Sequence, residues 1–501
     1  MHQPTRRPND PKKASSAVVT RTKNGITEML MGLRHPDVPT FPDFWSFPGG
    51  GVSKEDRILA SAGDIWKDSS VDVSIIALFR ELAEETGFAL DPGGSWKIIG
   101  PELRSSICSG GEAWIECIEN SRVSINPEEI SLVTERTTPP LAPLRYSNRF
   151  YHLHLGDSML EPQQPPGRSE FTEFKWWRPD DLLRSWEIGA ARMAPPQVTF
   201  VRDVVQYMKE GGSALDSLRE LERKPRLGKH KIEFAPGVEC LPIPTETLPP
   251  STHTNCFLLG RGKDLLIVDP AVQNDEAAGI IQHRLKSLAR DGMKVVGILY
   301  THRHPDHVGN QSMISKLIDA PSYGTKETLA EIGHGLEVSE GYVFDLGDGH
   351  PWEVLETPGH CPGMISLHAD VGILSADNVT MVGTILVPSE DGSMAEYFRS
   401  LDRLLDLDPN LLFPSHGPVC AAPHRLLQRT HKHRMERHAR VLDAVRSGCK
   451  SLDEIASFAY KDAPGAPIGL ARDQSLSHLI CLEEEGLIAS DGNLYTIPDE
   501  N

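Results

Sequence analysis

The chain has 501 residues, of which 39% are hydrophobic and 24% are charged, and its formal net charge is −19. This composition excludes a fibrous or intrinsically disordered chain, and the length corresponds to two to four domains of about 100–200 residues each. No apolar run approaches the roughly 18–20 residues that span a bilayer, so we expect no membrane association. The acidic balance argues against nucleic-acid binding over the whole surface, although a local basic patch stays compatible with it.

The first residues and the cysteines predict a cytoplasmic protein. Residues 1–13 contain Pro4, Pro8 and Pro11 and no apolar stretch, so we expect neither a secretory signal nor an amphipathic transit peptide. None of the eight cysteines forms a CxxC pair, which favours reduced thiols over a disulfide framework. Nothing in the sequence indicates the oligomeric state.

The first block of the chain, residues 14–210, mixes short strands with amphipathic helices. We expect strands where β-branched and aromatic residues gather, at 15–20, 27–34, 148–155 and 171–177. Apolar spacing predicts a helix at 71–87, and a second helix at 195–210 opens with prolines. Residues 211–230 are rich in charge and are predicted to form a helical linker.

The rest of the chain predicts an α/β domain followed by a small helical one. In residues 231–421 strand-like runs alternate with helices. The strands are expected at 255–260, 264–269, 294–300, 352–357, 364–368 and 371–377, and the helices at 274–292 and 394–408. Residues 424–501 read as three helices and a short hairpin with an Asp-Gly turn. The expectation is a multidomain α/β and α+β protein.

A cluster of histidine and aspartate follows the strand at 294–300. Zn²⁺ binds imidazole nitrogen and carboxylate oxygen, and the HxHxDH spacing can serve two adjacent ions, with the first two histidines facing one ion and the last two residues the other. The residues of this motif are His302, His304, Asp306 and His307. Further ligands must come from later loops, and the candidates are His360, Asp377 and His416.

Together with Asp269, these residues resemble the metallo-β-lactamase superfamily over residues 231–421. The resemblance implies an αββα sandwich with two zinc ions per chain at the edge of the two sheets. It assigns one zinc to His302, His304 and His360, the other to Asp306, His307 and His416, and a bridging position to Asp377. Asp269 would lie behind the ligands. Two ions about 3.5–4 Å apart lower the pKa of water between them and clamp the oxygen of the electrophile, which makes Asp306 and Asp377 the catalytic residues.

Within that superfamily, the segment after Asp377 and the tail at 472–497 resemble the lactamase-beta-like endoribonucleases, whose tail is similar to a winged helix. Thioesterases that act on carrier-bound acyl groups are neighbours of this subfamily, so the substrate stays open. The chain departs from the pattern twice: Ala376 stands where glycine usually precedes the bridging aspartate, and Cys361-Pro362-Gly363 follows His360 where endoribonucleases tend to carry polar residues. The second departure weakens the ribonuclease expectation more than it weakens zinc binding.

A second candidate site lies on the helix predicted at 71–87. Glu81, Glu84 and Glu85 share one face of this helix, and three carboxylates so placed favour a hard cation, Mg²⁺ or Mn²⁺. Arg80 could neutralise one of them. A glycine loop, Gly49–Gly51, precedes the helix and is a candidate substrate-binding element. The alternative is an ordinary helix face whose charged side chains are solvated.

These residues resemble the Nudix box over residues 14–210, similar to the branch that includes peroxisomal coenzyme A diphosphatases. Arg80 and the three glutamates match its second half, with Glu84 and Glu85 as catalytic metal ligands. In the first half Asp56 stands where glutamate is usual, and residues 57–79 separate it from Arg80 where the box has seven, so about 16 residues are inserted. We expect residues 66–70 of this insert to form an exposed loop before the helix resumes near Val71, with Glu55 or Asp56 as a fourth carboxylate. The resemblance implies Mg²⁺-dependent cleavage of a nucleoside diphosphate linkage; the alternative is a domain that only binds nucleotides and regulates.

The resulting prediction is a fusion of two metal-dependent hydrolases that act on small phosphate- or acyl-containing substrates. The zinc domain would cleave an ester, thioester or phosphodiester and the Nudix domain a diphosphate, with coenzyme A derivatives as one common substrate. RNA processing is the rival function. Residues 424–440 carry five Arg, one Lys and four His, so RNA is a candidate partner, although a packing helix explains the same pattern.

Overall fold

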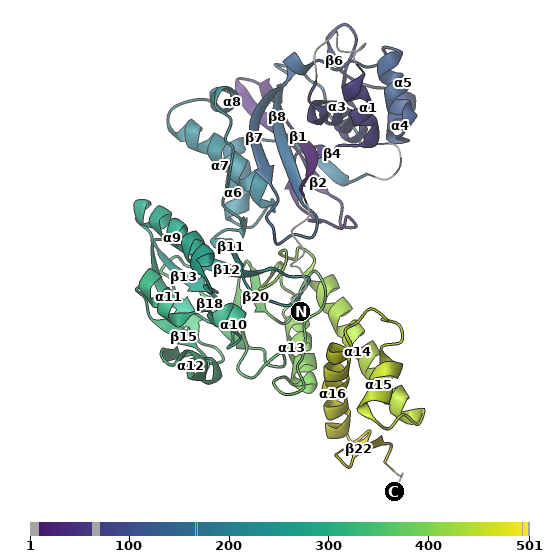
Figure 1. The fold of residues 1–501 in the computed structure, drawn as a ribbon. Helices are drawn as coiled ribbons and strands as arrows, with labels where there is room; N and C mark the ends of the chain where they lie inside the picture. Colours follow the sequence, from purple (N-terminus) through teal and green to yellow (C-terminus); the bar gives the residue numbers. More distant parts are fainter. Residues whose placement is uncertain (1–9, 63–70, 166, 168, 493, 499–501) are drawn as a thin grey trace. The chain divides into compact units, whose positions relative to one another are not determined.

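The computed structural model describes residues 10–62, 71–165, 167, 169–492 and 494–498. The chain divides into two compact units, residues 1–236 and 237–501, and each unit has its own sheets and cores (Figure 1). None of the helices in the described ranges has the length and apolar character that crossing a bilayer requires.

The first unit is built on one mixed sheet, in the order β3-β2-β1-β8-β7 with β4 beside β1 and β9 beside β2. β1 and β8 run parallel and the other pairs run antiparallel. The strands are β1 (Lys12–Lys23), β2 (Ile26–Arg34), β3 (Trp45–Ser46), β4 (Gly49–Gly51), β7 (Ser131–Thr137), β8 (Tyr146–His154) and β9 (Phe171–Trp177). A separate hairpin joins β5 (Phe88–Leu90) to β6 (Trp96–Ile98).

Helices cover both faces of this sheet, because side chains along a strand alternate between its faces. Ala17 and Val19 of β1 pack in one core with α3, whereas Val18 packs in the other with α7. The helices of the first face are α1 (Lys54–Ser61), α3 (Val73–Thr86), α4 (Pro101–Cys108) and α5 (Glu112–Glu119). Those of the second are α6 (Pro179–Glu187), α7 (Pro195–Lys209) and α8 (Ala214–Arg223), and a 3-10 turn, η1 (Pro127–Glu129), precedes β7. Figure 1 shows the two helical layers on either side of the sheet.

The segment 211–230, expected as a linker, contributes to the first unit's core instead. Ser213 caps α8 in a capping box, and Leu218 and Leu221 are buried in the core beside α7. The unit continues to β10 (Glu233–Ala235). The charged residues that suggested a linker are the solvent face of an amphipathic helix.

The second unit begins as two sheets packed between helices. Within residues 237–501, the strands of one sheet follow the order β11-β12-β13-β14-β15-β16 and those of the other the order β17-β18-β19-β20-β21. Phe257 of β12 and Phe413 of β21 meet between them, edge to face. The strands of the first sheet are β11 (Val238–Pro244), β12 (His253–Leu259), β13 (Asp264–Val268), β14 (Lys294–Leu299), β15 (Ser322–Gly324) and β16 (Leu336–Glu337). Those of the second are β17 (Val343–Phe344), β18 (Trp352–Glu356), β19 (Ile365–Ala369), β20 (Gly372–Ala376) and β21 (Leu412–Pro414).

Helices close the outer faces of both sheets. Ile281 and Leu288 of α9 and Ile314 of α11 pack on the first sheet. Tyr397 and Leu401 of α13 pack on the second. The helices concerned are α9 (Asp275–Arg290), α10 (Pro305–Val308), α11 (Gln311–Leu317), α12 (Lys326–Ile332) and α13 (Met394–Asp406). The layers therefore run helix, sheet, sheet, helix, as expected.

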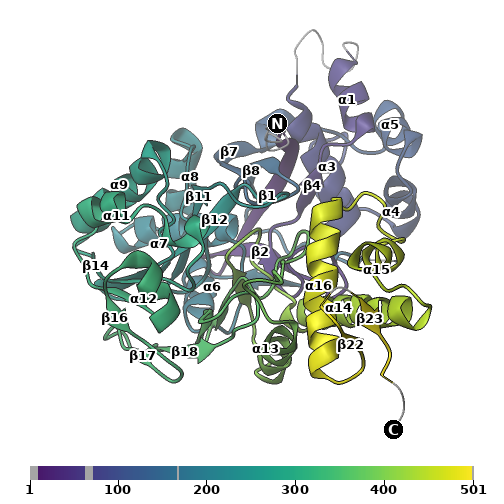
Figure 2. The same ribbon diagram turned by 60° about the horizontal axis from the view of Figure 1, so that its bottom comes forward.

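The chain ends in three helices and a hairpin, also as expected. α14 (Pro423–Arg446), α15 (Leu452–Ala459) and α16 (Ile468–Glu484) share a small apolar core, and β22 (Ala489–Ser490) pairs antiparallel with β23 (Tyr495–Thr496). Figure 2 shows α16 lying across α14.

Candidate metal centre

The histidine and aspartate residues predicted from the sequence converge at the carboxyl ends of strands in the two packed sheets. β14 leads into the HxHxDH turn and α10, β18 leads to His360, β20 to Asp377, and β21 to His416. His304 Nδ1 lies 3.1 Å from His302 Nε2 and 2.9 Å from His360 Nε2. One set of three imidazoles therefore aims its nitrogens at a common point.

The second set meets beside the first. His416 Nε2 lies 3.4 Å from Asp306 Oδ2, and His307 Nε2 lies 3.9 Å from Asp306 Oδ1. Asp377 Oδ2 stands between the two sets, 3.7 Å from Nε2 of both His360 and His307 and 3.5 Å from His416 Nε2. The arrangement has two foci with one shared carboxylate.

Each of the five histidines holds its other ring nitrogen on a group outside the cluster, which fixes ring orientation and tautomer. Asp269 Oδ2 accepts from Nδ1 of His307 at 2.9 Å. The other four pairs are His302 Nδ1 with Thr301 Oγ1, His304 Nε2 with Asp391 Oδ2, His360 Nδ1 with the Leu386 carbonyl and His416 Nδ1 with the His253 carbonyl, at 2.7–3.1 Å. The nitrogens left over all face the two foci.

Several buried polar atoms of the cluster lack a partner. In the described part of the chain, His307 Nε2 and Asp377 Oδ1 have no hydrogen-bond partner, although both residues are buried. An unsatisfied buried polar atom costs about 1–3 kcal/mol. A cation at each focus would satisfy these atoms, so the residues fit the two metal ions that the sequence implied.

The electrostatics of the cluster divide its histidines: the pKa values of His302 and His304 are lowered, whereas those of His307 and His416 are raised by the adjacent carboxylates. Burial lowers the pKa of His304 to about 4 and that of His302 well below its usual value, so both imidazoles are neutral at pH 7. Burial opposes ionisation of Asp306, yet the adjacent His307 and His416 bring its pKa down to about 2. Burial also opposes protonation of His416, but Asp377 and Asp306 raise its pKa to about 10, so a metal ion there would displace a proton.

Two backbone positions shape the cluster. Ala376, where the sequence comparison expected glycine, has φ +46°, in the left-handed region that glycine adopts most easily. Gly359, next to His360, has φ +130°, and a Cβ atom there would lie 2.4 Å from the backbone of Tyr397. Only glycine therefore lets the His360 loop approach α13 this closely.

Comparison with known proteins agrees with this geometry. The family model of the metallo-beta-lactamase superfamily matches residues 250–416. An uncharacterized protein of Aquifex aeolicus (strain VF5) is 31% identical over 173 residues, which are 30% of this chain and 77% of the relative. The domain that contains these residues belongs to the metallo-beta-lactamase superfamily. It is a hydrolase, and the expected fold class, with its αββα sandwich, is confirmed.

Other relatives cover a larger share of the chain. The Beta-lactamase-like protein 2 homolog of Drosophila melanogaster is 28% identical over 255 residues, 46% of this chain and 83% of the relative. An atrochrysone carboxyl ACP thioesterase of Aspergillus chevalieri is 27% identical over 248 residues, 48% of this chain and 73% of the relative. Among solved structures, a NUDIX hydrolase from Alicyclobacillus acidocaldarius covers 39% of this chain and 91% of its own, with 21% identity and a TM-score of 0.34.

The metallo-beta-lactamase domain contains two residues that the sequence did not single out as part of its centre. Asp391 binds His304 and also pairs with Arg303. Cys361 is buried, and its Sγ lies within 4.8 Å of ligand atoms of His302 and His304. Asp391 lies in a loop without any periodic pattern, so no sequence signal indicates it.

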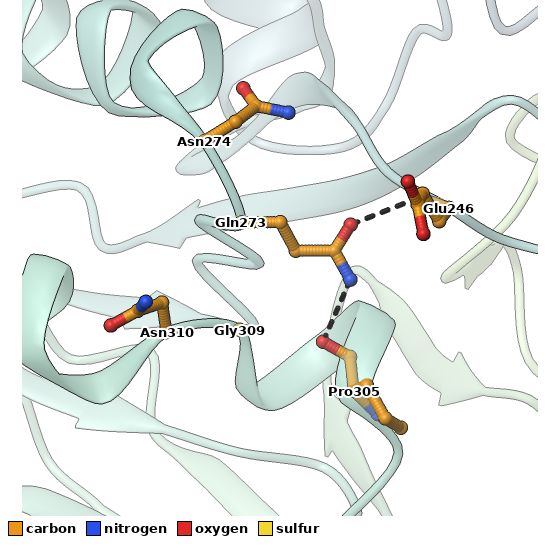
Figure 3. Close-up of a pocket in the computed structure, with 6 residues that line it drawn as sticks. All are labelled: Glu246, Gln273, Asn274, Pro305, Gly309 and Asn310. Atoms are coloured by element: carbon orange, nitrogen blue, oxygen red, sulfur yellow. Dashed lines mark hydrogen bonds between the residues drawn. The ribbon is translucent and has the colours of Figure 1, made fainter.

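A polar pocket of about 430 Å³ lies alongside α10 of the same domain. Figure 3 shows the Gln273 side chain at its centre, where Nε2 donates to the Pro305 carbonyl at 3.1 Å and Oε1 accepts from the Glu246 backbone at 3.0 Å. Asn274 and Asn310 cap α9 and α11 on either side of it. The lining includes Pro305 but none of the seven candidate ligands.

The glutamate helix of the first unit is α3, and it faces the glycine loop as expected. Glu85 Oε2 accepts from Gly49 N at 2.7 Å, and a Cβ atom on Gly50 would lie 2.4 Å from Glu81 Oε1. Burial and the neighbouring Glu84 raise the pKa of Glu81 to about 7 against the effect of Arg80. A cation would relieve this repulsion, so the carboxylates fit one, although within the described ranges the three do not close to mutual distances of 4.8 Å.

Arg80 organises the carboxylates around it. It pairs with Glu81 at 2.9 Å and with Glu84 and Asp56 at 3.0 Å each. Asp56 is fully buried, and its carboxylate pairs with Arg80 and accepts from the Ser53 backbone at the cap of α1. Residues 54–61 form the helix α1, and the loop expected at 66–70 lies outside the described residues.

The basic helix of the tail, α14, directs two of its arginines inward. Arg434 and Arg437 are 2% and 6% exposed, and Arg437 pairs with Asp462. These charges are therefore engaged inside the second unit, which leaves fewer of them to meet a phosphate backbone.

Proposed function

We propose that the second unit is a dinuclear zinc hydrolase. One ion would be held by His302, His304 and His360 and the other by Asp306, His307 and His416, and Asp377 would lie between them. The observation that carries the proposal is the set of five histidines whose outer nitrogens are all held, so that every inner nitrogen points to one of two foci. When bound, two such ions lower the pKa of water and polarise the oxygen of the bond to be cleaved.

The chain's own residues supply orientation and proton balance. Asp269 holds His307 through Nδ1 and also accepts from the Thr301 backbone and hydroxyl, so it sets the HxHxDH turn against β13. Asp391 and the Leu386 carbonyl orient His304 and His360 in the same way. A site held from outside in this manner needs little rearrangement when it reacts.

We favour a carboxylic thioester as the substrate class. A relative with 73% of its length covered is named an atrochrysone carboxyl ACP thioesterase. The inward-facing Arg434 and Arg437 weaken the rival, an RNA phosphodiester. Ester and phosphodiester substrates belong in the same test.

The test is a hydrolysis panel with the zinc-loaded full chain, comprising an acyl-coenzyme A, an acyl-carrier protein thioester, an oxygen ester and a structured RNA. We expect thioester cleavage to exceed the other activities and to vanish in Asp377→Asn. Cleavage of RNA alone, sensitive to the same substitution, would replace the thioester assignment and keep the zinc centre.

For the first unit we propose a Nudix-type diphosphohydrolase that uses Mg²⁺ or Mn²⁺ at Glu81, Glu84 and Glu85. The support is the contact of the glycine loop with these carboxylates, together with their raised pKa values, which a cation would reverse. Gly49–Gly51 would receive the diphosphate. Coenzyme A derivatives are the substrate class on which both units would act. Magnesium-dependent release of a phosphorylated product from coenzyme A by the full chain tests this proposal, and nucleotide binding without cleavage would favour a regulatory domain.

A further inference from the structure

The C-terminal helices contain a second set of metal-ligating side chains, outside the dinuclear centre. Within the described residues, four groups of three His, Cys, Asp or Glu side chains bring their ligand atoms within 4.8 Å of one another. Three of these groups belong to the dinuclear centre. The fourth consists of His438 on α14 with Cys481 and Glu485 at the end of α16.

The distances in this fourth group match those between ligands of one ion. His438 Nε2 lies 3.3 Å from Glu485 Oε2, and Cys481 Sγ lies 3.5 Å from Glu485 Oε1. The corresponding separations in the dinuclear centre are 2.9–3.9 Å. Ligands that are each about 2.0–2.3 Å from a tetrahedral zinc are separated by similar amounts.

Helical geometry brings the three together. Cys481 and Glu485 are four residues apart, so they share a face of α16 that turns toward α14. His438 and Cys481 are 6% and 1% exposed, whereas the Glu485 side chain is 44% exposed. Two ligands are therefore desolvated, and the third opens a path from solvent.

A buried second histidine stands behind the first. His478 Nδ1 lies 3.1 Å from His438 Nδ1, so one of the two rings donates and the other accepts. His478 is itself fully buried. Metal-binding histidines regularly donate their other nitrogen to such an outer partner.

We infer that His438, Cys481 and Glu485 bind a third divalent ion of the zinc class, which ties α14 to α16. The soft thiolate and the imidazole favour Zn²⁺ over Mg²⁺ or Ca²⁺, and three protein ligands leave the fourth position to water. On binding, the Cys481 thiol releases its proton to solvent. The role is structural, since the ion would link two helices whose shared apolar core is small.

Cobalt substitution tests this inference on the full chain. Thiolate-bound Co²⁺ gives a near-ultraviolet charge-transfer band that imidazole and carboxylate ligands do not give. We expect the band in the wild-type chain, its loss with one metal equivalent in Cys481→Ser, and its persistence in Cys449→Ser and in His302→Ala. The His302→Ala variant separates this site from the dinuclear centre. If the dinuclear centre does not bind metal, the band should remain.

Two results would overturn the inference. One is a cobalt-loaded wild-type chain without the band; the other is a band that Cys361→Ser removes and Cys481→Ser leaves, which would assign the thiolate to the dinuclear centre. As a second measurement, zinc should raise the melting temperature of the wild-type chain more than that of Glu485→Gln. Equal shifts in the two proteins would also contradict a third ion.

Discussion

At the scale of single residues, the centre depends on side chains that are held before any metal arrives. The aspartate between the two foci is the residue on which both sets depend, since its Oδ2 lies within 3.7 Å of three histidines. Its other oxygen is buried without a partner among the described residues. The carboxylate charge, rather than its shape, is what the site requires.

Asp377→Asn should therefore lower hydrolysis by orders of magnitude and reduce the zinc content, because the amide cannot bridge two cations. The fold should persist, since the side chains are nearly isosteric. Metal analysis, turnover and circular dichroism of the same preparation provide the measurement. Wild-type turnover in a folded variant would contradict the two-ion centre.

Gly359→Ala should destabilise the second unit by about 1–3 kcal/mol or more, because the new methyl meets the backbone of Tyr397 in addition to the strain of a positive φ. Gly347→Ala is the matched control, since its φ is also positive (+72°) but nothing lies within 4 Å of the added atom. Urea unfolding of both variants measures the difference. Equal losses would show that the close approach carries no cost.

At the scale of elements, the C-terminal helices reach the metal centre through one loop. Arg434 of α14 donates to the Ile385 carbonyl and the Thr384 hydroxyl, and Gln474 of α16 exchanges hydrogen bonds with the backbone of Val387. Leu386, between these anchored residues, accepts from His360 Nδ1. The tail thus positions His360, a proposed ligand of the first ion.

We expect Arg434→Met to weaken zinc binding at that ion by about tenfold, within the range of outer-partner substitutions. The reason is that the 384–387 loop loses its anchor and His360 its fixed acceptor. Arg429→Met, on the exposed face of the same helix, is the control and should leave affinity unchanged. Competition with a chelator measures both, and equal affinities would mean that the tail merely packs.

The glutamate helix α3 offers a test in the first unit. Glu84→Gln should abolish magnesium-dependent diphosphate cleavage while costing little stability, since it removes like charge from one helix face, although it also gives up the ion pair with Arg80. Product release from coenzyme A and thermal unfolding measure the two effects. The exposed Glu116→Gln on α5 is a matched control. Undiminished cleavage in Glu84→Gln would remove this residue from the metal site.

At the scale of the whole molecule, each unit has cores of its own, so loss of zinc should change the structure around the metal centre and leave the first unit unchanged. A zinc-selective chelator should abolish hydrolysis by the metallo-beta-lactamase domain, and added Zn²⁺ should restore it. Amide exchange should rise in the loops at 301–309, 358–363 and 377–387, and remain unchanged in α3 and β1. Uniform exchange before and after chelation would contradict a centre that orders these loops.

The sequence alone determined the fold class and the residues that converge. A motif such as HxHxDH after an apolar strand predicts that the remaining ligands follow other strands, because the carboxyl ends of neighbouring strands meet at one edge of the sheet. The helix that carries Glu81, Glu84 and Glu85 was equally readable, because helical spacing depends only on local geometry.

Only the tertiary structure decided which groups contact and orient those residues. Asp391 and the Leu386 carbonyl orient histidines across loops that have no pattern, and Asp56 turned out to serve Arg80. The helix at 214–223 joined a core although its charges suggested a linker, and His438 met Cys481 from another helix. These relations involve residues far apart in the chain, and local propensity contains no information about which distant partner the packing will supply.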